Sequence, residues 1–351
     1  MKLLVLGGTG FIGPHVVRRL VAAGHGVTIA HTGTHEAELP ESVRHLHTEG
    51  VRRGGRDLTE VADHAARSRP DAVLDMAPMS EDDARRAVEA LRGRTGRLVA
   101  VSSGDVYRAY DRLRGKDPGP PDPTPLTEDS PLRDRLYPYR GENLPVGEAE
   151  RRWLDDYDKI LVERVVMAEP SLPGTILRLP MVYGPGDPQR RFFNQCHLKR
   201  MLDRRPAILL DEALAGWRCL WGYVENVAAA VALALTDPRA AGRVYNVAEP
   251  EPVPEAEWIA RVGRAADWRG EIIPLPKERL PEHLGWSRNA EQDWAMSSER
   301  IRRELGYREV VPQDEALRRT VAWERANPPE SFDPAKYDYA AEDRVLAELG
   351  R

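Results

Sequence analysis

Short apolar runs alternate with amphipathic stretches over roughly the first half of the chain. The run at residues 3–6 predicts a buried strand, and the helical spacing of Val16, Val17 and Leu20 predicts a helix over residues 11–23. Further strands are predicted at 26–30, 43–47, 71–76, 97–101, 175–179 and 244–247, and further helices at 81–91, 154–167 and 223–235. Strands that alternate with helices favour an α/β fold, a Rossmann-like doubly wound parallel sheet.

The pattern changes beyond residue 183. Residues 184–216 have a loop-like, basic composition, and a proline-rich segment follows at 273–281. Helical spacing returns near 255–266, 298–305 and 314–327. We therefore predict a first domain from residues 1–183 joined by about 219–248, a smaller, mostly helical substrate domain from 184–218 and 249–330, and a C-terminal tail at 331–351 that forms a surface helix or arm.

Glycines follow the first strand at once, in the order Gly7, Gly10 and Gly13. Between a strand and a helix, this spacing lets the backbone turn tightly and approach a pyrophosphate, while the third glycine lets the helix pack closely. The helix N-terminus adds free N–H groups and the positive end of its dipole. The sequence therefore predicts a dinucleotide site with the pyrophosphate over Phe11 and Ile12.

The choice between NAD and NADP is undecided by the sequence. Dinucleotide folds commonly place an acid about twenty residues beyond the glycine loop to hold the ribose 2′-hydroxyl, or an arginine near a 2′-phosphate. Here the second strand ends in His31 and Thr32, which are neither. We expect these two residues beside the adenosine ribose and the adenine near Asp57 and Leu58.

Composition and charge exclude several classes of protein. The formal net charge is −5 and the pI is about 6.1, which leaves no basic footprint for nucleic acid. Cys196 and Cys219 have neither disulfide-framework nor zinc spacing, so no metal is expected. No apolar run approaches the ~18 residues of a membrane span, and residue 1 leads directly into the first strand instead of a signal peptide. We expect a cytoplasmic protein with a small-molecule substrate, and a homodimer is an open alternative.

Hydroxyl groups end the strand predicted at residues 97–101, in the sequence VSSGDVY. At the carboxyl end of a central strand, Ser102 and Ser103 would point into the crevice where open α/β sheets bind ligands. With the glycine loop, this segment resembles the extended short-chain dehydrogenase/reductase superfamily, specifically its NAD-dependent epimerase/dehydratase family. The resemblance implies that Ser103 is the catalytic hydroxyl, that Ser102 lies by the cofactor, and that Asp105 and Tyr107 face the substrate.

The resemblance extends along the chain. Met76 and Ala77 occupy the place where the family sets small residues against the cofactor, and LTEDSP at 126–131 resembles its active-site loop. LRLPMVYGPG at 177–186 resembles the segment that borders the nicotinamide, which implies cofactor contacts from Pro180 and Val182. YVENVA at 223–228 and YNV at 245–247 resemble later family segments.

Arg190, Arg191 and Arg218 lie in segments that contact a nucleotide-sugar diphosphate in the family, and guanidinium groups suit phosphate. It is an equally good interpretation that these three arginines are ordinary surface residues without a ligand.

One departure concerns the Tyr-x-x-x-Lys motif of the family. Lys159 and Glu163 reproduce the family's Lys-x-x-x-Glu, which puts Asp155 in the tyrosine's place. The alternative register uses Tyr157 and places Leu161 at the lysine position. We predict the first register, with Asp155 and Lys159 on one helix face and Tyr157 pointing elsewhere.

In the family, the lysine holds the ribose and lowers the pKa of the tyrosine that exchanges a proton with the substrate. Without that phenol, we expect Asp155, or Tyr137 or Tyr139 from the long segment at 133–153, to handle the proton. The resemblance implies an NAD(P)-dependent enzyme of epimerase/dehydratase type that acts by hydride transfer on a sugar-like or nucleotide-sugar molecule. The alternatives are a reductase or dehydrogenase of another small metabolite, and a cofactor-binding protein without redox turnover.

Overall fold

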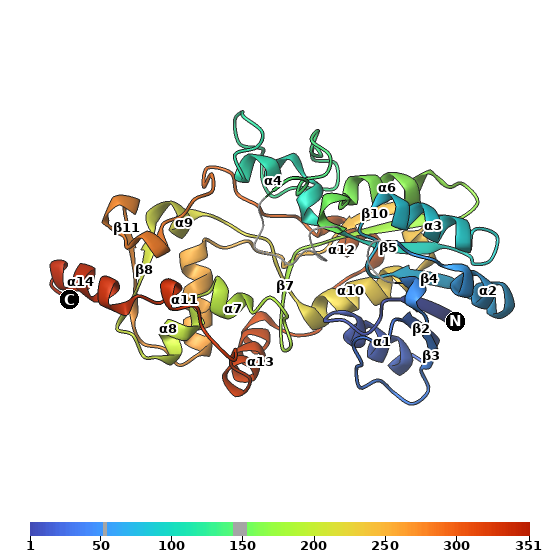
Figure 1. Ribbon diagram of the computed structural model, residues 1–351, viewed down its shortest axis with the longest axis horizontal. Helices are drawn as coiled ribbons and strands as arrows, with labels where there is room; N and C mark the ends of the chain where they lie inside the picture. Colours follow the sequence, from blue (N-terminus) through green and yellow to red (C-terminus); the bar gives the residue numbers. More distant parts are fainter. Residues whose placement is uncertain (52–54, 143–152) are drawn as a thin grey trace.

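The computed structural model describes residues 1–51, 55–142 and 153–351. Figure 1 shows a sheet flanked by helices at one end of the molecule, which carries the N-terminus, and a smaller part at the other end, which carries the C-terminus.

The centre of the larger part is a seven-stranded parallel sheet with the order β10-β6-β5-β4-β1-β2-β3. Its central strands are short apolar runs buried on both faces, as parallel sheets require. The strands are β1 (Lys2–Leu6), β2 (Gly26–His31), β3 (Arg44–His47), β4 (Ala72–Asp75), β5 (Leu98–Ser103), β6 (Gly174–Leu179) and β10 (Arg243–Asn246). The strand order reverses between β1 and β4, which places a ligand crevice at the carboxyl ends of these strands.

Helices cover both faces of this sheet (Figure 1). On one face, α1 (Gly13–Ala22) packs against α10 (Val224–Thr236), and their apolar residues form one cluster with β1 and β2. On the other face, α2 (Thr59–Ser68), α3 (Glu81–Leu91) and α6 (Lys159–Ala168) cover a second cluster. The doubly wound α/β fold predicted from the sequence is confirmed.

The smaller part contains regular structure that the sequence analysis missed. β8 (Ala207–Asp211) pairs in parallel with β11 (Glu271–Leu275), and β7 (Met181–Tyr183) pairs with β9 (Trp221–Tyr223). The loop-like interpretation of residues 184–216 was therefore wrong, because β8 and three short helices lie in that segment. The first four residues of β8 are apolar, and all five of its residues are buried. Pro274 is tolerated in β11 because a two-stranded sheet consists of edges only.

The remaining helices are short or lie in the second half of the chain. They are α4 (Arg108–Leu113), α7 (Arg191–Asn194), α8 (Leu198–Leu202), α9 (Glu212–Gly216), α11 (Glu255–Ala265), α12 (Glu299–Leu305), α13 (Gln313–Ala326) and α14 (Tyr339–Glu348), with 3-10 turns at 49–51, 104–106, 238–240, 277–279, 282–284 and 334–336. The C-terminal tail does form a helix, and Leu346 packs it onto β8 and β11. Among the described residues, no helix has the length and apolar character needed to cross a membrane.

The helix predicted at 154–167 is interrupted, because residues 153–155 are helical but residues 156–158 are not, and α6 follows them. Its first residue is Lys159, because the Asp158 carboxylate caps it by accepting a hydrogen bond from the Ile160 backbone N–H. Asp158 itself has an extended backbone. The residues just before α6 therefore do not follow the spacing of a helix. This break determines which of their side chains reach the crevice.

Candidate active site

The loop between β1 and α1 is shaped by its glycines. Gly7 has φ of +80°, a conformation that favours glycine. A Cβ on Gly13 would lie 2.5 Å from the carbonyl oxygen of Gly8, so α1 starts in close contact with the loop. A Cβ on Gly10 would meet no described atom within 4 Å. The loop thus leaves open room over Gly10, as a dinucleotide pyrophosphate requires.

The N-terminus of α1 adds the electrostatic part of this cradle. Phe11 and Ile12 precede the helix, both partly buried against the core, and no described side chain caps the first turn. Its N–H groups and the positive end of its dipole are therefore available to an anion. The residues present fit the pyrophosphate of NAD or NADP.

The end of β4 lies beside the glycine loop. A Cβ on Gly7 would be 3.8 Å from the Cβ of Met76 and 4.0 Å from that of Ala77. A buried ion pair that the sequence analysis missed supports this edge: Arg56 donates to the Asp75 carboxylate at 2.5 Å and to the Ala77 carbonyl at 2.6 Å. Met76 and Ala77 therefore stand where the cofactor contacts predicted for them are feasible.

Of the residues predicted around the adenosine, His31 and Leu58 are buried, whereas Asp57 is exposed. Leu58 is buried in the apolar cluster under α2. The Asp57 carboxylate accepts hydrogen bonds from the Thr59 backbone and hydroxyl, which lower its pKa. The His31 ring is buried and contacts β3, and the Thr32 hydroxyl pairs with another threonine hydroxyl. Their contacts with a cofactor stay a prediction.

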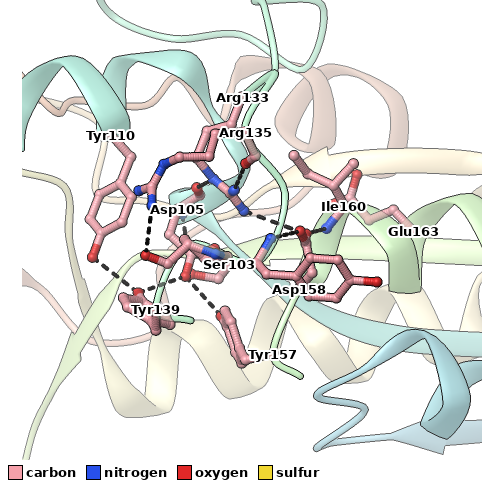
Figure 2. A network of polar contacts seen from close by, with 12 residues as sticks. Ser103, Asp105, Tyr110, Arg133, Arg135, Tyr139, Tyr157, Asp158, Ile160 and Glu163 are labelled. Carbon is pink, nitrogen blue, oxygen red and sulfur yellow. Dashed lines mark hydrogen bonds and ion pairs between the residues drawn. The ribbon is translucent and has the colours of Figure 1, made fainter. Parts of the chain in front are cut away.

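A group of phenols surrounds one buried carboxylate just beyond β5 (Figure 2). Tyr157 donates to Asp105 Oδ2 at 2.8 Å, and Tyr139 donates to the same oxygen at 3.1 Å. The Tyr110 hydroxyl lies 3.0 Å from that of Tyr139. The Ser103 hydroxyl accepts a hydrogen bond from the Asp105 backbone N–H at 3.2 Å. This phenol cluster (Tyr110, Tyr139, Tyr157 and Asp105) places acidic protons next to the predicted catalytic serine.

Burial dominates the protonation of this cluster. It raises the pKa of Asp105, against the lowering effect of Arg133 and of the Tyr157 hydrogen bond. It raises the pKa of Tyr157 well above its ordinary value, and the Asp105 charge raises it further, while the Ser103 hydroxyl lowers it. Asp105 Oδ1 is buried without a partner among the described residues. Tyr157 therefore keeps its proton at neutral pH.

Lys159 connects the phenol cluster to the crevice. Its ammonium donates to the Pro78 carbonyl at 2.6 Å, after β4, and to the Val101 carbonyl at 3.1 Å, within β5. It lies 5.8 Å from the centre of the Tyr157 ring. A positive charge is thus held between the two strand ends that border the crevice.

The register predicted around Asp155 was wrong. Because α6 begins at Lys159, Asp155 does not lie one helical turn before the lysine. Its carboxylate instead accepts a hydrogen bond from the Gly141 backbone at 3.2 Å, and its carbonyl accepts one from Arg140. Tyr157, which was expected to point elsewhere, is 8 % exposed and directed at Asp105. The structure shows no replacement of the phenol.

Of the two tyrosines predicted to reach the crevice from residues 133–153, one does. Tyr139 joins the phenol cluster. The Tyr137 ring lies under the Arg140 guanidinium, 3.7 Å from its carbon, and its backbone N–H donates to Asp158. Residues 143–152 of that segment lie outside the described residues.

Two residues of the VSSGDVY segment have structural contacts instead of the expected ones. Tyr107 is fully buried; its hydroxyl donates to Asn246 at 2.6 Å and accepts from Arg178 at 2.9 Å, so it does not face a substrate. The Ser102 hydroxyl is buried and donates to Glu163 at 2.6 Å. Ser102 therefore joins β5 to α6, and Tyr107 joins the segment after β5 to β6 and β10.

The predicted substrate arginines differ in their availability. Arg190 pairs with Glu324 at 2.5 Å, and Arg191 pairs with Asp187 at 2.6 Å and donates to the Val182 carbonyl. Arg218 is 43 % exposed and lies 3.7 Å from an aspartate. Val182 is buried, and Pro180 lies 2.6 Å from where a Cβ on Gly222 would be. Arg218 is the most accessible of the three guanidinium groups.

Comparison with known sequences is consistent with this geometry. The sequence profile described as the NAD dependent epimerase/dehydratase family matches residues 3–248. A 2′-dehydrokanamycin reductase of Streptomyces kanamyceticus is 31% identical over 285 residues, which cover 81% of this chain and 72% of that protein. A 3-diazoavenalumate denitrifying reductase of a Streptomyces species is 26% identical over 324 residues, which cover 89% of this chain and 97% of that protein.

Solved structures share the fold. A UDP-glucose 4-epimerase of Thermus thermophilus, solved in complex with NAD, superposes with a TM-score of 0.62 at 24% identity over 93% of this chain and 100% of that chain. MoeE5, solved in complex with UDP-glucose and NAD, superposes with a TM-score of 0.62 at 18% identity over 94% of this chain and 100% of that chain.

Proposed function

Because the chain belongs to the NAD-dependent epimerase/dehydratase family, an extended short-chain dehydrogenase/reductase family of NAD(P)-dependent enzymes, we propose that it reduces a carbonyl group on a sugar-like small molecule by hydride transfer. The observation that carries the proposal is the Tyr157 phenol, held in protonated form beside Ser103 at the crevice. The related chains named as reductases support the direction.

The binding part of the reaction rests on the glycine loop. The open room over Gly10 and the N-terminus of α1 would hold the pyrophosphate, and Met76 and Ala77 would line the cofactor beyond it. The bound reduced nicotinamide supplies the hydride to the carbonyl carbon.

The proton part rests on Tyr157. A carbonyl that gains a hydride becomes an alkoxide and needs one proton, which the Tyr157 O–H gives while its bond to hydrogen breaks. The Ser103 hydroxyl would donate a hydrogen bond to the same substrate oxygen and orient it. The Lys159 ammonium, 5.8 Å from the Tyr157 ring, stabilises the phenolate left behind. A general acid so placed contributes typically ~10²–10⁴-fold.

The phenol cluster favours reduction over oxidation. A tyrosine that works as a base must ionise readily, and here burial and the Asp105 carboxylate raise the pKa of Tyr157. Asp105 is a positioning residue: its carboxylate accepts hydrogen bonds from the Tyr157 and Tyr139 hydroxyls and fixes the direction of both phenols. Bound substrate oxygen would compete with Asp105 Oδ2 for the Tyr157 proton.

The proposed substrate is sugar-like, and a nucleotide-sugar remains one form of it. Arg190 and Arg191 are already paired with carboxylates, so Arg218 is the guanidinium with the greatest access for a substrate phosphate. Hydroxyl groups of a sugar would find the Ser103 and Tyr139 hydroxyls at the same edge.

The test follows cofactor oxidation with a small panel of substrates. We expect the purified protein to consume NADH or NADPH in the presence of 2′-dehydrokanamycin, with one cofactor oxidised per carbonyl reduced. Conversion of UDP-glucose to UDP-galactose without net change of the cofactor would overturn the reductase proposal in favour of an epimerase. Tight binding of NAD(P) with no hydride transfer to any carbonyl or hydroxyl compound of the panel would show a cofactor-binding protein without redox turnover.

A further inference from the structure

Three histidines lie together at the outer edge of the seven-stranded sheet. His31 is the last residue of β2, and His45 and His47 lie on β3, the edge strand. The parallel register pairs His31 with His47. Residues two apart on a strand share one face, and so do residues paired across strands. The three imidazoles therefore project from the same face of the sheet.

The rings are close enough to share one ligand. One nitrogen from each histidine lies within 4.8 Å of the others, and His31 Nε2 is 3.0 Å from His45 Nδ1. The ring centres of His31 and His47 are 4.4 Å apart. His31 is 2 % exposed, whereas His45 and His47 are exposed, so the group is anchored on its inner side and open on its outer side.

The inner histidine has an unused polar atom. Nδ1 of His31 is buried and has no hydrogen-bond partner in the described part of the chain. Neutral imidazoles whose nitrogens converge are the form in which histidine binds metal ions.

A carboxylate lies on the same side of Gly33 as the His47 ring. A Cβ built on Gly33 would be 3.4 Å from His47 Nδ1 and 3.8 Å from the Glu36 carboxylate. Gly33 has φ of +77°, and its missing side chain leaves the carboxylate and the imidazole facing the same space. Three imidazoles with one carboxylate or a water form a donor set that suits zinc and its neighbours in the first transition row.

We propose that His31, His45 and His47 bind one divalent transition-metal ion of the zinc type, with Glu36 or water as the fourth ligand. The ion would join the edge strand β3 and the segment after β2 to the body of the sheet. It lies outside the phenol cluster and takes no part in the proton transfer proposed there.

The test uses protein without a polyhistidine tag, freed of metal by a chelator that is then removed. Co²⁺ is titrated in, and its visible absorption reports the bound ion. Zn²⁺ added afterwards should displace it. We expect one Co²⁺ per chain, and we expect His45→Ala and His47→Ala each to weaken binding by more than about tenfold, the loss that removal of even an outer-shell partner typically causes.

His64→Ala on α2 is the matched control and should bind Co²⁺ as the unchanged protein does. Because His45 and His47 are exposed, both variants should keep the far-ultraviolet circular dichroism of the parent. Zn²⁺ should raise the melting temperature of the parent and of His64→Ala only. Absence of saturable binding in the parent, or equal binding in His45→Ala and His47→Ala, would overturn the proposal. Neither readout depends on enzymatic activity.

Discussion

Glycine-to-alanine substitutions at Gly13, where α1 begins, and at Gly10, in the loop before it, should affect different properties. Gly13→Ala should lower the free energy of unfolding, whereas Gly10→Ala should weaken cofactor binding. In Gly13→Ala, the new Cβ would lie 2.5 Å from the Gly8 carbonyl oxygen and 2.6 Å from its carbonyl carbon. Both are backbone atoms, so α1 or the loop must shift, and overpacking of this kind typically costs ~1–3 kcal/mol. Replacing glycine by alanine returns ~0.4–1 kcal/mol through the unfolded chain. The net expectation is a loss of about 1–2 kcal/mol in the free energy of unfolding.

Gly10→Ala is the matched partner. Its Cβ would meet no described atom within 4 Å, and its φ is outside the left-handed region, so the free energy of unfolding should stay the same or rise by up to ~1 kcal/mol. The Cβ would, however, occupy the room proposed for the pyrophosphate. We expect NAD(P) affinity to fall by more than about tenfold, or ~1.4 kcal/mol.

Urea unfolding and cofactor titration by tryptophan fluorescence measure both effects. The urea slope should be equal in the three proteins, so that a shift in midpoint reports stability. A Gly13→Ala protein as stable as the parent would refute the packing argument. A Gly10→Ala protein with the parent's affinity for NAD(P) would refute the placement of the pyrophosphate.

Three further predictions concern the cofactor, a buried acid and the phenol cluster. NAD and NADP should bind with affinities within about tenfold of each other, because His31 and Thr32 offer neither an acid nor an arginine; a titration that gives a thousandfold gap would show that another residue discriminates. Burial raises the pKa of Glu255 to about 8, so the folded protein holds a proton that the unfolded chain releases near pH ~4.5. In urea unfolding, the free energy of unfolding of the parent should therefore fall, relative to that of Glu255→Gln, by up to about 4 kcal/mol between about pH 5 and about pH 8. Glu257→Gln on the same helix should show the same pH dependence of stability as the parent over this range. Asp105→Asn removes a negative charge beside Tyr157 and lowers the pKa of that phenol, so the alkaline limit of the pH–kcat profile for reduction should move to lower pH with little change in KM; an unmoved limit would exclude this positioning role.

The sheet and its glycine loop were predictable because their signals are local. Leu3–Leu6 is a compact apolar run, and the helix at 81–91 carries its own start signal, with Ser80 and Asp83 forming a capping box. Strand pairing then follows from the alternation of strands and helices. The strands β8 and β11 escaped prediction because basic and proline residues surround two short runs that pair with each other across about 60 residues of sequence.

The position of Tyr157 was mispredicted because the family's Tyr-x-x-x-Lys spacing was applied as if residues 155–159 formed a helix. The spacing to Lys159 has meaning on a helix face only if residues 155–159 are helical, and Asp158 starts the helix at Lys159. An aspartate directly before an apolar periodic run is a cap signal that could have shown this. The phenol cluster and the three histidines depend on contacts between segments far apart in sequence: 52 residues separate Asp105 from Tyr157, and strand register brings His31 to His47.

The proposed reaction depends on Tyr157 as the proton donor in hydride transfer. The most direct test is the single-turnover rate of NADH or NADPH oxidation, measured for Tyr157→Phe and Asp155→Ala. The substrate is the carbonyl compound that the parent protein is found to reduce. We expect Tyr157→Phe to lower this rate by ~10²–10⁴-fold, with cofactor affinity retained, and Asp155→Ala to leave it near the parent's. A Tyr157→Phe protein that transfers hydride at the parent's rate, or an Asp155→Ala protein that has lost the reaction, would contradict this role of Tyr157.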